Sequence, residues 1–282
     1  FGKSSYMYSI GLNGLGLKCI NAMSDIFVVD TWREDKHAHA EFSKGEKIKS
    51  ELEDCQDHET GTRVYFRPDA TVLRDISMPK APYQDCLEMY AYVNSGLTIN
   101  FVYAGKKETY CRPEGTLGYF EDRIIKARKL RILSKPIVLT DETTQEEVVE
   151  YEIPAADGVP AHVEKETKTV KMGYTAIFTW AENIQSELGE SYVNGLRTIN
   201  NGTHVTGFKG ALTDAIKKYI DKNDMIPKAT KITIDGTDIR DNLVDLVLAK
   251  HSAPDYTTQI KDALENSDVQ YFIKSSVYKT FS

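Results

Sequence analysis

The chain has 282 residues, of which 41% are hydrophobic and 27% charged, and its formal net charge is -7. This length can bury one large core or two ordinary ones, and the negative charge argues against a basic surface covering the whole protein, although a local basic face for nucleic acid remains open. The longest apolar runs are too short to span a membrane, and nothing at the N-terminus reads as a signal peptide.

The cysteines indicate the cellular compartment. They are spread along the chain without a C-x-x-C pair, at Cys19, Cys55, Cys86 and Cys111. This spacing suits free thiols in a reducing cytosol better than disulfides or a zinc site. We therefore expect a cytoplasmic protein, and the cysteine spacing assigns no metal ligand.

The first predicted element is a glycine-rich turn that opens a helix, IGLNGLGLKCINAMS at residues 10–24. Gly11, Gly14 and Gly16 surround Asn13 and lead directly into apolar residues at helical spacing. Such a turn presents unpaired backbone N–H groups, at the positive end of the helix dipole, to an approaching anion. The sequence thus suggests a phosphate site, but a tight turn that merely needs positive φ at its glycines explains the same pattern.

The first half of the chain then alternates between predicted strands and helices. Strands are expected at 26–31, 37–42 and 60–66, an acidic loop at 43–59, a helix at 81–93, and a hairpin made of 97–102 and 108–111. The turn residues around Arg112–Gly118 predict a domain boundary.

The second half continues this alternation. Helices are expected at about 119–130 and at 207–220, an exposed strand pair or loop insertion at 141–168, strands at 137–139, 171–180, 192–199, 232–234 and 241–250, and a loop at 257–267 that opens a last helix. Strands mixed with helices throughout indicate an α/β or α+β fold.

Five blocks of this sequence, in this order, resemble the ATPase region of the B subunits of bacterial type II topoisomerases. The blocks are SIGLNGLGLKCINAMS (9–24), TGTRVYFRPD (60–69), YVNSG (92–96), YVNGLRTINNGTHVTGFKGALT (192–213) and DIRDNLVDLVLAKHSAPDYTTQIKDALENSDV (238–269). Each block alone is weak, but five with similar spacing are specific, and they cover nearly the whole chain. The chain is thereby identified as a member of the family that includes DNA gyrase and topoisomerase IV.

The resemblance implies an α+β fold made of α/β sandwiches. Residues 1–115 are expected to form part of a GHKL nucleotide-binding domain, from the ATP lid onward, and residues 116–282 a transducer domain of the ribosomal-S5-like kind. It also places Phe1 inside the family's ATP lid, and the sequence begins with this Phe rather than with a Met. The acidic general base, the Asn that binds Mg²⁺ and the Asp that recognises adenine are therefore expected in a preceding part of the protein.

The resemblance assigns the glycine turn to the triphosphate of ATP. Its cofactor-binding positions are expected to be Gly11, Leu12, Asn13, Gly14, Leu15, Gly16 and Leu17. The position of Asn13 is commonly His in the family, and Asn keeps a hydrogen-bond donor but cannot titrate. Thr62 matches the Thr that helps to hold adenine, although a Thr packed in an alternating strand fits the residue pattern equally well.

Two further positions come from the second half of the chain. Gln259 and Lys261 correspond to the Gln and Lys of the family's QTK loop, where the Lys reaches the γ-phosphate and stabilises the charge that moves in phosphoryl transfer. The central Thr is Ile260 here. Without the resemblance, Lys261 would be interpreted as a surface lysine near a helix start.

Other conspicuous residues receive structural interpretations. His204, in NGTH, is more typical of a structural hydrogen bonder or helix cap than of a catalytic group. A basic cluster at 123–131 could contact DNA phosphates, because the family's second domain surrounds a cavity for DNA, but a solvated helix face is the more common origin of such a pattern.

The resemblance implies an ATP-hydrolysing DNA topoisomerase that uses ATP and Mg²⁺ and couples nucleotide turnover to DNA strand passage. Its implied partners are DNA, the A-type breakage-reunion subunit and a second copy of the full-length subunit. Three alternatives stay open: a catalytically incomplete fragment that acts as a structural transducer module, another GHKL-family ATPase such as a chaperone, mismatch-repair protein or histidine kinase, and a viral or mobile-element homologue. Because the general base and the Mg²⁺ ligand are expected in a preceding part of the protein, we predict no ATP hydrolysis by residues 1–282 alone.

Overall fold

The computed structural model describes residue 8 and residues 14–56, 58–153, 162–184, 186–227 and 232–281. Its contacts divide the chain into two units, Gly11–Tyr83 and Phe1–Ile10 with Gln84–Ser282. The domain boundary expected between residues 115 and 116 stays a prediction.

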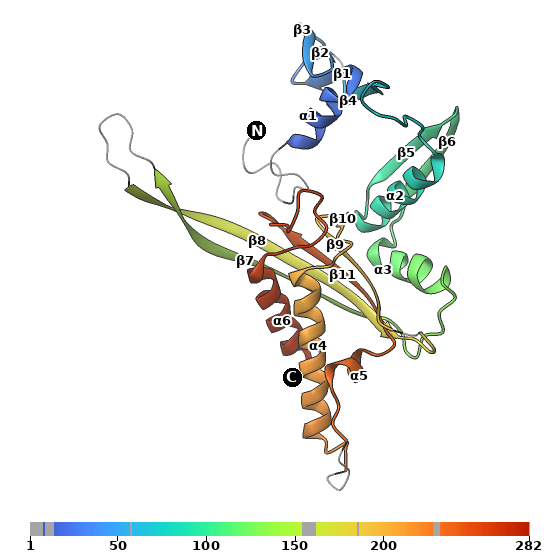
Figure 1. The fold of residues 1–282 in the computed structure, drawn as a ribbon, viewed down its shortest axis with the longest axis vertical. Coiled ribbons are helices and arrows are strands. Elements are labelled where there is room, and N and C mark those ends of the chain that lie inside the picture. The colour runs from blue at the N-terminus through green and yellow to red at the C-terminus, as the bar shows by residue number, and fades with distance from the viewer. Residues whose placement is uncertain are drawn as a thin grey trace. The chain divides into compact units, whose positions relative to one another are not determined.

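The Gly11–Tyr83 unit is one helix and one antiparallel sheet, drawn in blue in Figure 1. Its elements are α1 (Leu15–Ala22), β1 (Ser24–Arg33), β2 (Lys36–Ser43), β3 (Glu46–Asp54) and β4 (Gly61–Pro68), and the strand order is β3-β2-β1-β4. Phe27 on β1 is buried and packs edge-to-face on Phe42 of β2, with ring centroids 6.1 Å apart. This aromatic pair therefore anchors the register of the two central strands.

From Gln84 onward, the larger unit contains most of α2 (Lys80–Val93) and a hairpin of β5 (Thr98–Tyr103) and β6 (Lys106–Cys111). It continues with α3 (Gly115–Tyr119), the π-helical segment η1 (Phe120–Lys126), β7 (Ile137–Ile153), β8 (His162–Trp180), β9 (Leu188–Val193) and β10 (Leu196–Arg197). The last elements are α4 (Thr203–Lys222), α5 (Gly236–Arg240), β11 (Leu243–His251) and α6 (Ser267–Phe281).

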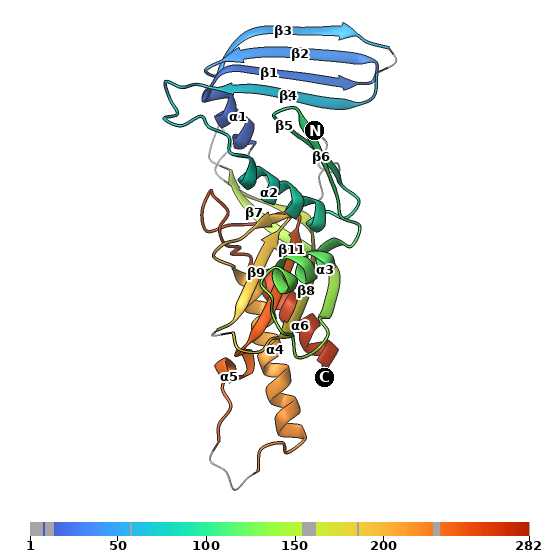
Figure 2. The same cartoon turned by 90° about the vertical axis from the view of Figure 1, so that its right-hand side faces the viewer.

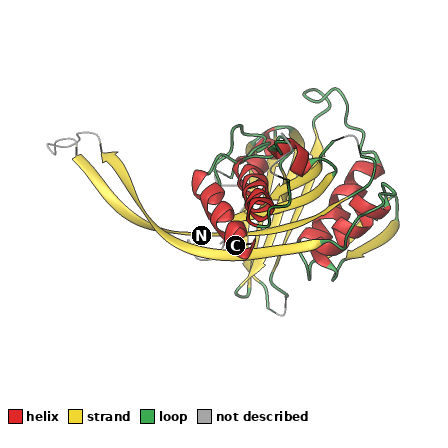
Figure 3. Ribbon diagram, turned by 90° about the horizontal axis from the view of Figure 1, so that it is seen from below, coloured by secondary structure: helices red, strands yellow, loops and turns green. Residues whose placement is uncertain are grey.

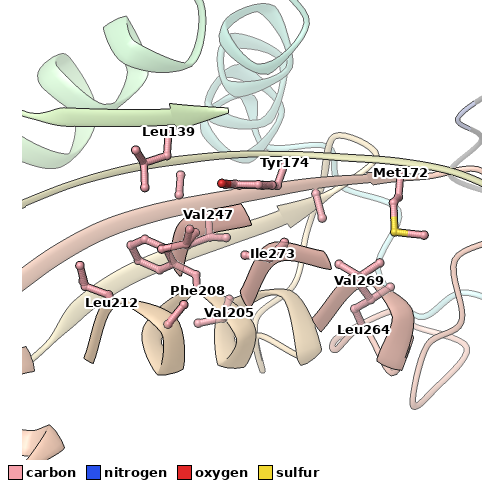
Figure 4. Packing of buried hydrophobic residues seen from close by; sticks show 14 of the residues in the cluster. Leu139, Met172, Tyr174, Val205, Phe208, Leu212, Val247, Leu264, Val269 and Ile273 are labelled. Carbon is pink, nitrogen blue, oxygen red and sulfur yellow. The ribbon is translucent and has the colours of Figure 1, made fainter. Parts of the chain in front are cut away.

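A five-stranded sheet organises this unit, in the order β10-β9-β11-β8-β7. β11 pairs parallel with β9 and antiparallel with β8, and nearly all of its residues are buried. Its side chains alternate between the two faces, so that Leu243 and Val247 join the core beneath α4 and α6, whereas Val244 and Leu246 pack with η1. Both faces of the sheet are thus covered by helices, and Figure 4 shows the α4 and α6 side of this core.

The strand pair expected around 141–168 is confirmed as the outer part of the β7–β8 hairpin. The two strands stay paired from Ile137 opposite Phe178 to Ile153 opposite His162. Their outer ends reach past the helices as a two-stranded ribbon (Figure 3). The sequence there is strongly acidic and polar because the ribbon has no helix to cover it.

Four expectations about elements were wrong. The acidic loop expected at 43–59 contains β3, whose nine residues are all exposed; it pairs with β2 through its backbone and has no apolar alternation to reveal it. The strand expected at 192–199 is β9 and β10 joined at Asn194 and Gly195, whose positive φ values of 50° and 82° suit a two-residue hairpin turn. Residues 232–234, expected as a strand, are irregular, and the helix expected at about 119–130 has other bounds, since it begins earlier with α3 and continues as η1 to Lys126.

Candidate functional site

The glycine turn leads into an open helix start. Gly11, Leu12 and Asn13 lie outside the described residues, and Gly14 is the N-cap of α1 in the left-handed conformation, with φ 62°. Among the residues that the structure describes, no side chain caps this end, and the first turn of α1 carries no acidic residue. Leu15 and Leu17 are also exposed, so the positive end of the helix dipole faces solvent and is suited to an anion.

The other end of α1 is fastened to the sheet. The Ser24 hydroxyl donates to the Ile20 carbonyl at 2.6 Å, and the Asp69 backbone N–H donates to the Met23 carbonyl at 2.9 Å. The Asp69 carboxylate in turn lies 2.9 Å from the Lys44 ammonium. These contacts hold the helix against β1 and against the turn that follows β4. The sheet therefore fixes the position of the N-terminal end of α1.

Thr62 lies on β4 directly opposite Thr31 of β1. The two hydroxyl oxygens are 2.7 Å apart and exposed. One hydroxyl can donate one hydrogen bond and accept two, so this pair leaves capacity for a ligand or a water. The geometry therefore fits both the adenine contact implied by the family and a cross-strand Thr pair.

Gln259 and Lys261 lie in one loop between β11 and α6. Lys261 has a left-handed backbone with φ 60°, and its N–H donates to the Thr258 carbonyl at 3.0 Å. Ile260 between them is 76% exposed. A non-glycine residue keeps this conformation when surrounding contacts stabilise it, so the backbone of this loop has a defined conformation.

Asp262 is the residue that builds this loop. One carboxylate oxygen accepts hydrogen bonds from the hydroxyls of Thr257 at 2.9 Å and Thr258 at 2.5 Å, and the other accepts from the Asn200 amide at 2.7 Å. These bonds, with that from Thr258 the strongest, hold the pKa of Asp262 below its ordinary value. Asp262 thus ties the Gln259–Lys261 loop to the turn that precedes α4.

The candidate site residues fall into two groups. Gly14, Leu15, Gly16, Leu17 and Thr62 belong to the Gly11–Tyr83 unit, whereas Gln259 and Lys261 belong to the larger unit. Within each unit the structure gives the local geometry described above. The ligand roles of all these residues stay predictions.

His204 is a core residue. It lies in the first turn of α4, it is fully buried, and burial lowers its pKa to about 3. Its Nε2 atom is 3.5 Å from the Thr198 hydroxyl. The imidazole is therefore neutral at physiological pH, which agrees with the structural role expected from the sequence.

The basic cluster around η1 is largely neutralised by nearby acids. Its ion pairs are Arg123 with Asp85 at 3.1 Å, Lys126 with Asp122 at 2.6 Å, Arg128 with Glu190 at 2.6 Å and Arg131 with Glu182 at 3.2 Å. The pairs of Arg123, Lys126 and Arg131 are largely exposed and contribute little to stability, whereas Arg128 pairs with the buried Glu190. All four pairs reduce the positive field of the face. This pairing supports a solvated helix face.

Sequence reasoning missed one cluster, in which Asp30, His37 and His39 bring three ligand-type atoms within 4.8 Å of one another. The signal available in the sequence was the H-A-H spacing on a predicted strand, since alternate residues of a strand share a face. Its carboxylate partner lies on another strand and could not be paired with it without the register.

No helix in the described ranges is long and apolar enough to cross a membrane.

Comparisons with known proteins give the family. The family model described as DNA gyrase B matches residues 134–282. The DNA gyrase B subunit of Eisenibacter elegans is 31% identical over 273 residues, covering 94% of this chain and 51% of the relative, and the DNA topoisomerase 4 B subunit of Francisella tularensis is 28% identical over 281 residues, covering 98% and 40%. The chain thus spans about half the length, or less, of these curated relatives.

Among solved structures, the topoisomerase IV ATP-binding domain of Francisella tularensis in complex with a small-molecule inhibitor is similar, with a TM-score of 0.70 and 26% identity. The match covers 96% of this chain and 67% of that one. The fold is accordingly the mixed α+β fold of these ATPase regions. The chain belongs to the B-subunit family of bacterial type II topoisomerases, gyrase B and topoisomerase IV B, and corresponds to their ATPase region.

Proposed function

We propose that this chain is the ATPase and transducer portion of a type II DNA topoisomerase, which couples ATP binding and hydrolysis to DNA strand passage. The observation that carries the proposal is the uncapped, exposed start of α1 behind the left-handed Gly14. A triphosphate supplies the negative charge that this helix end lacks in its first turn. In this proposal residues 1–115 form the GHKL portion and residues 116–282 the transducer.

The nucleotide contacts are divided between the two portions. Backbone N–H groups of the turn and first helical residues, Gly11 to Leu17, hold the phosphates, and the Thr62 hydroxyl contacts adenine directly or through water. ATP arrives with Mg²⁺, for which the residues named above supply no assigned ligand. The fit of ATP to this chain therefore rests on the open helix start and on the exposed Thr62 hydroxyl.

Lys261 is proposed to sense the γ-phosphate, with Gln259 beside it. A lysine is a compact point charge that stabilises the charge spread over a transferring phosphoryl group. The Lys261 side chain leaves from a loop that Asp262 fastens to the turn before α4. Movement of this loop toward the nucleotide would then be passed to α4 and to the sheet beneath it.

The proposed partners are those of the family: DNA, the A-type breakage-reunion subunit, and a second copy of the full-length subunit. The B-type chain supplies the ATP-driven gate, and its A-type partner breaks and rejoins DNA. Gyrase and topoisomerase IV activities differ in the DNA wrapped around the enzyme, and supercoiling assays with each kind of A-type partner would distinguish them.

The test is Lys261→Ala in the full-length subunit assembled with its A-type partner. We expect ATP turnover to fall by about a hundredfold or more, while binding of a non-hydrolysable ATP analogue changes by less than about tenfold, because the lysine acts on charge that develops in the transition state. Lys222→Ala at the exposed end of α4 is the matched control. Ile260→Thr, which restores the family's residue, should leave turnover within about twofold.

The result also separates the two main interpretations. Unchanged turnover in Lys261→Ala would refute the role assigned to this lysine. A structural transducer module without turnover predicts analogue binding with no Mg²⁺-dependent phosphate release in the unmodified protein.

A further inference from the structure

A second candidate site lies on the sheet of the Gly11–Tyr83 unit, at a place that the proposed function does not use. Asp30 on β1 and His37 and His39 on β2 bring three ligand atoms together. The His37 Nε2 atom is 3.0 Å from Asp30 Oδ1, and the His39 Nδ1 atom is 2.8 Å from the same oxygen. Two imidazole rings therefore converge on a single carboxylate oxygen.

The register of the sheet produces this convergence. Asp30 lies directly opposite His39, and Trp32 lies directly opposite His37. Since alternate residues of a strand point to the same face, all four side chains share one face of the sheet. Figure 2 shows β1 and β2 side by side at the centre of this sheet. Thr62 lies opposite Thr31, one position away from Asp30, and so points to the other face.

The hydrogen bonds around His39 leave a place for a cation. Its Nε2 atom is 2.9 Å from a Glu41 carboxylate oxygen, so this nitrogen carries a proton that it donates. In the neutral ring the Nδ1 atom then holds a lone pair that faces Asp30 Oδ1. Two acceptors at 2.8 Å repel each other unless a second proton or a metal ion lies between them.

Arg63 orients the Asp30 carboxylate toward the two imidazoles. Its Nε and Nη2 atoms donate to Asp30 Oδ2 at 3.0 and 2.7 Å, which fixes the plane of the carboxylate. Only 2% of the Asp30 surface is exposed. Asp30 Oδ1, the oxygen that faces the imidazoles, is thereby held in position, and Glu41 holds His39 in the same way. Hydrogen-bond partners outside a metal site commonly orient its ligands like this.

The surroundings carry excess negative charge. Glu51 and Glu53 of β3 line a cavity of about 240 Å³ together with His37, His39 and Lys49. Four carboxylates (Asp30, Glu41, Glu51 and Glu53) face two cationic side chains (Lys49 and Arg63), which leaves a surplus of two negative charges when both imidazoles are neutral. A divalent ion would balance that surplus, and the cavity gives it access and room for water.

We infer that Asp30, His37 and His39 bind one divalent transition-metal ion of the Zn²⁺ class. Ligand atoms about 2.1 Å from one ion at angles between about 90° and 109° lie about 3.0–3.4 Å apart. The imidazole nitrogens of His37 and His39 lie 3.0 and 2.8 Å from Asp30 Oδ1 and within 4.8 Å of each other, so binding of one ion would require a small adjustment of these side chains. Imidazole with carboxylate favours Zn²⁺, Co²⁺, Ni²⁺ or Cu²⁺ over Mg²⁺ and Ca²⁺, which prefer oxygen alone. The ion would cross-link β1 and β2.

Trp32 supplies a built-in reporter. Its ring stacks on His37 with centroids 4.8 Å apart and on His58 with centroids 4.5 Å apart. The only other tryptophan, Trp180, belongs to the other unit. Binding of Cu²⁺ at the site should therefore quench Trp32 emission, and Trp32→Phe should remove that quenching.

The test titrates the chelator-treated 282-residue chain with Zn²⁺ alone, followed by calorimetry and metal analysis after dialysis. We expect one ion per chain at micromolar free Zn²⁺, and His37→Gln should weaken it by about tenfold or more. His58→Gln is the matched control, since His58 stacks on the same tryptophan but its Nδ1 atom donates to the Glu59 carbonyl, outside the cluster. Its affinity should equal that of the unmodified chain.

Replacing Zn²⁺ by Co²⁺ shows which atoms bind. Visible d–d bands without a thiolate-to-metal band in the near ultraviolet are expected, because no cysteine belongs to the cluster. Equal affinity in the unmodified chain and in His37→Gln, a thiolate band, or loss of binding only in His58→Gln would overturn the inference. Absence of stoichiometric binding would also overturn it, and would show instead that a second proton on His39 joins it to Asp30. Trp32 emission during urea unfolding confirms that each variant that keeps Trp32 is folded.

Discussion

Asn200 donates its side-chain amide to the carboxylate of Asp262 at 2.7 Å, and its backbone N–H donates to the Asp262 carbonyl at 2.9 Å. Two turns that are 62 positions apart in the sequence are joined by these bonds. One turn opens α4 and the other carries Gln259 and Lys261. The pair is therefore the link between the proposed phosphate sensor and the core of its unit.

The first prediction concerns this link. Asp262→Ala removes the acceptor for Thr257, Thr258 and Asn200, so the loop should lose its fixed conformation. In the full-length subunit we expect kcat for ATP to fall by about tenfold or more with a smaller change in KM, because positioning is lost while nucleotide contacts remain. Steady-state phosphate release measures both. Asp221→Ala, on the exposed end of α4, should behave as the unmodified protein. A change of Asp262→Ala in KM alone would contradict the positioning role of Asp262.

A second prediction addresses the close approach of the same two turns. Gly202 has φ 136°, and a Cβ atom there would lie 2.4 Å from the Leu264 backbone nitrogen. Gly202→Ala should therefore lower the free energy of unfolding by about 2 kcal/mol or more, through strain and overpacking against backbone.

Gly210 in the middle of α4 provides the matched comparison. A Cβ atom there meets nothing within 4 Å, so Gly210→Ala should raise stability by about 0.5–1 kcal/mol. Urea unfolding followed by Trp180 fluorescence measures both variants in a Trp32→Phe background. Equal effects of the two substitutions would show that the Gly202 contact does not constrain the fold.

The strands that could be predicted from the sequence are those whose buried side chains leave an apolar pattern. β11 and the inner part of β8 were predicted because continuous apolar residues reflect a sheet covered on both faces. β3 was missed because its stability comes from backbone pairing with β2 at a sheet edge, which leaves no apolar pattern. Asn194 and Gly195 were predicted as strand residues, although their left-handed conformations make a hairpin turn there.

The sites divided in the same way. The residues of the glycine turn and of the Gln259–Lys261 loop could be named because each group is contiguous in the sequence and matches a block of the family, but their ligand roles stay predictions. Asp262 was passed over because its partners Thr257, Thr258 and Asn200 become neighbours only when two turns meet. The pairing of Asp30 with His39 required a strand register that composition and periodicity do not supply.

A third prediction concerns acid stability of the Gly11–Tyr83 unit. The Lys44 ammonium, followed by the Thr71 backbone N–H and hydroxyl, lowers the pKa of Asp69 to about 2. A lowered carboxyl pKa contributes stability that is present above the unfolded value near about 4 and lost as pH falls from about 4 to about 2. Asp69→Asn should thus be less stable than the unmodified chain at pH 5, and the difference should shrink toward pH 2.

Trp32 emission during urea unfolding reports this unit, in a Trp180→Phe background. Asp35→Asn is a suitable control, because Asp35 is exposed in the turn between β1 and β2 and takes no part in the contacts that join Asp69 to Lys44 and α1. A stability difference between Asp69→Asn and the unmodified chain that stays constant from pH 5 to pH 2 would contradict the assignment.

The last prediction concerns Asp245 on β11, whose side chain is buried 3.2 Å from the Lys209 ammonium, with Glu187 on the other side of that ammonium at 2.7 Å. Burial raises the pKa of Asp245 to about 6 despite Lys209. A raised carboxyl pKa favours the folded state below the unfolded value near about 4, and that contribution is lost as pH rises through about 6. The free energy of unfolding of Asp245→Asn should therefore rise relative to that of the unmodified chain between pH 4 and pH 7, as measured by urea unfolding with Trp180 emission. Asp221→Asn should show no such rise. A relative fall for Asp245→Asn over the same range would mean that the ion pair with Lys209 outweighs burial.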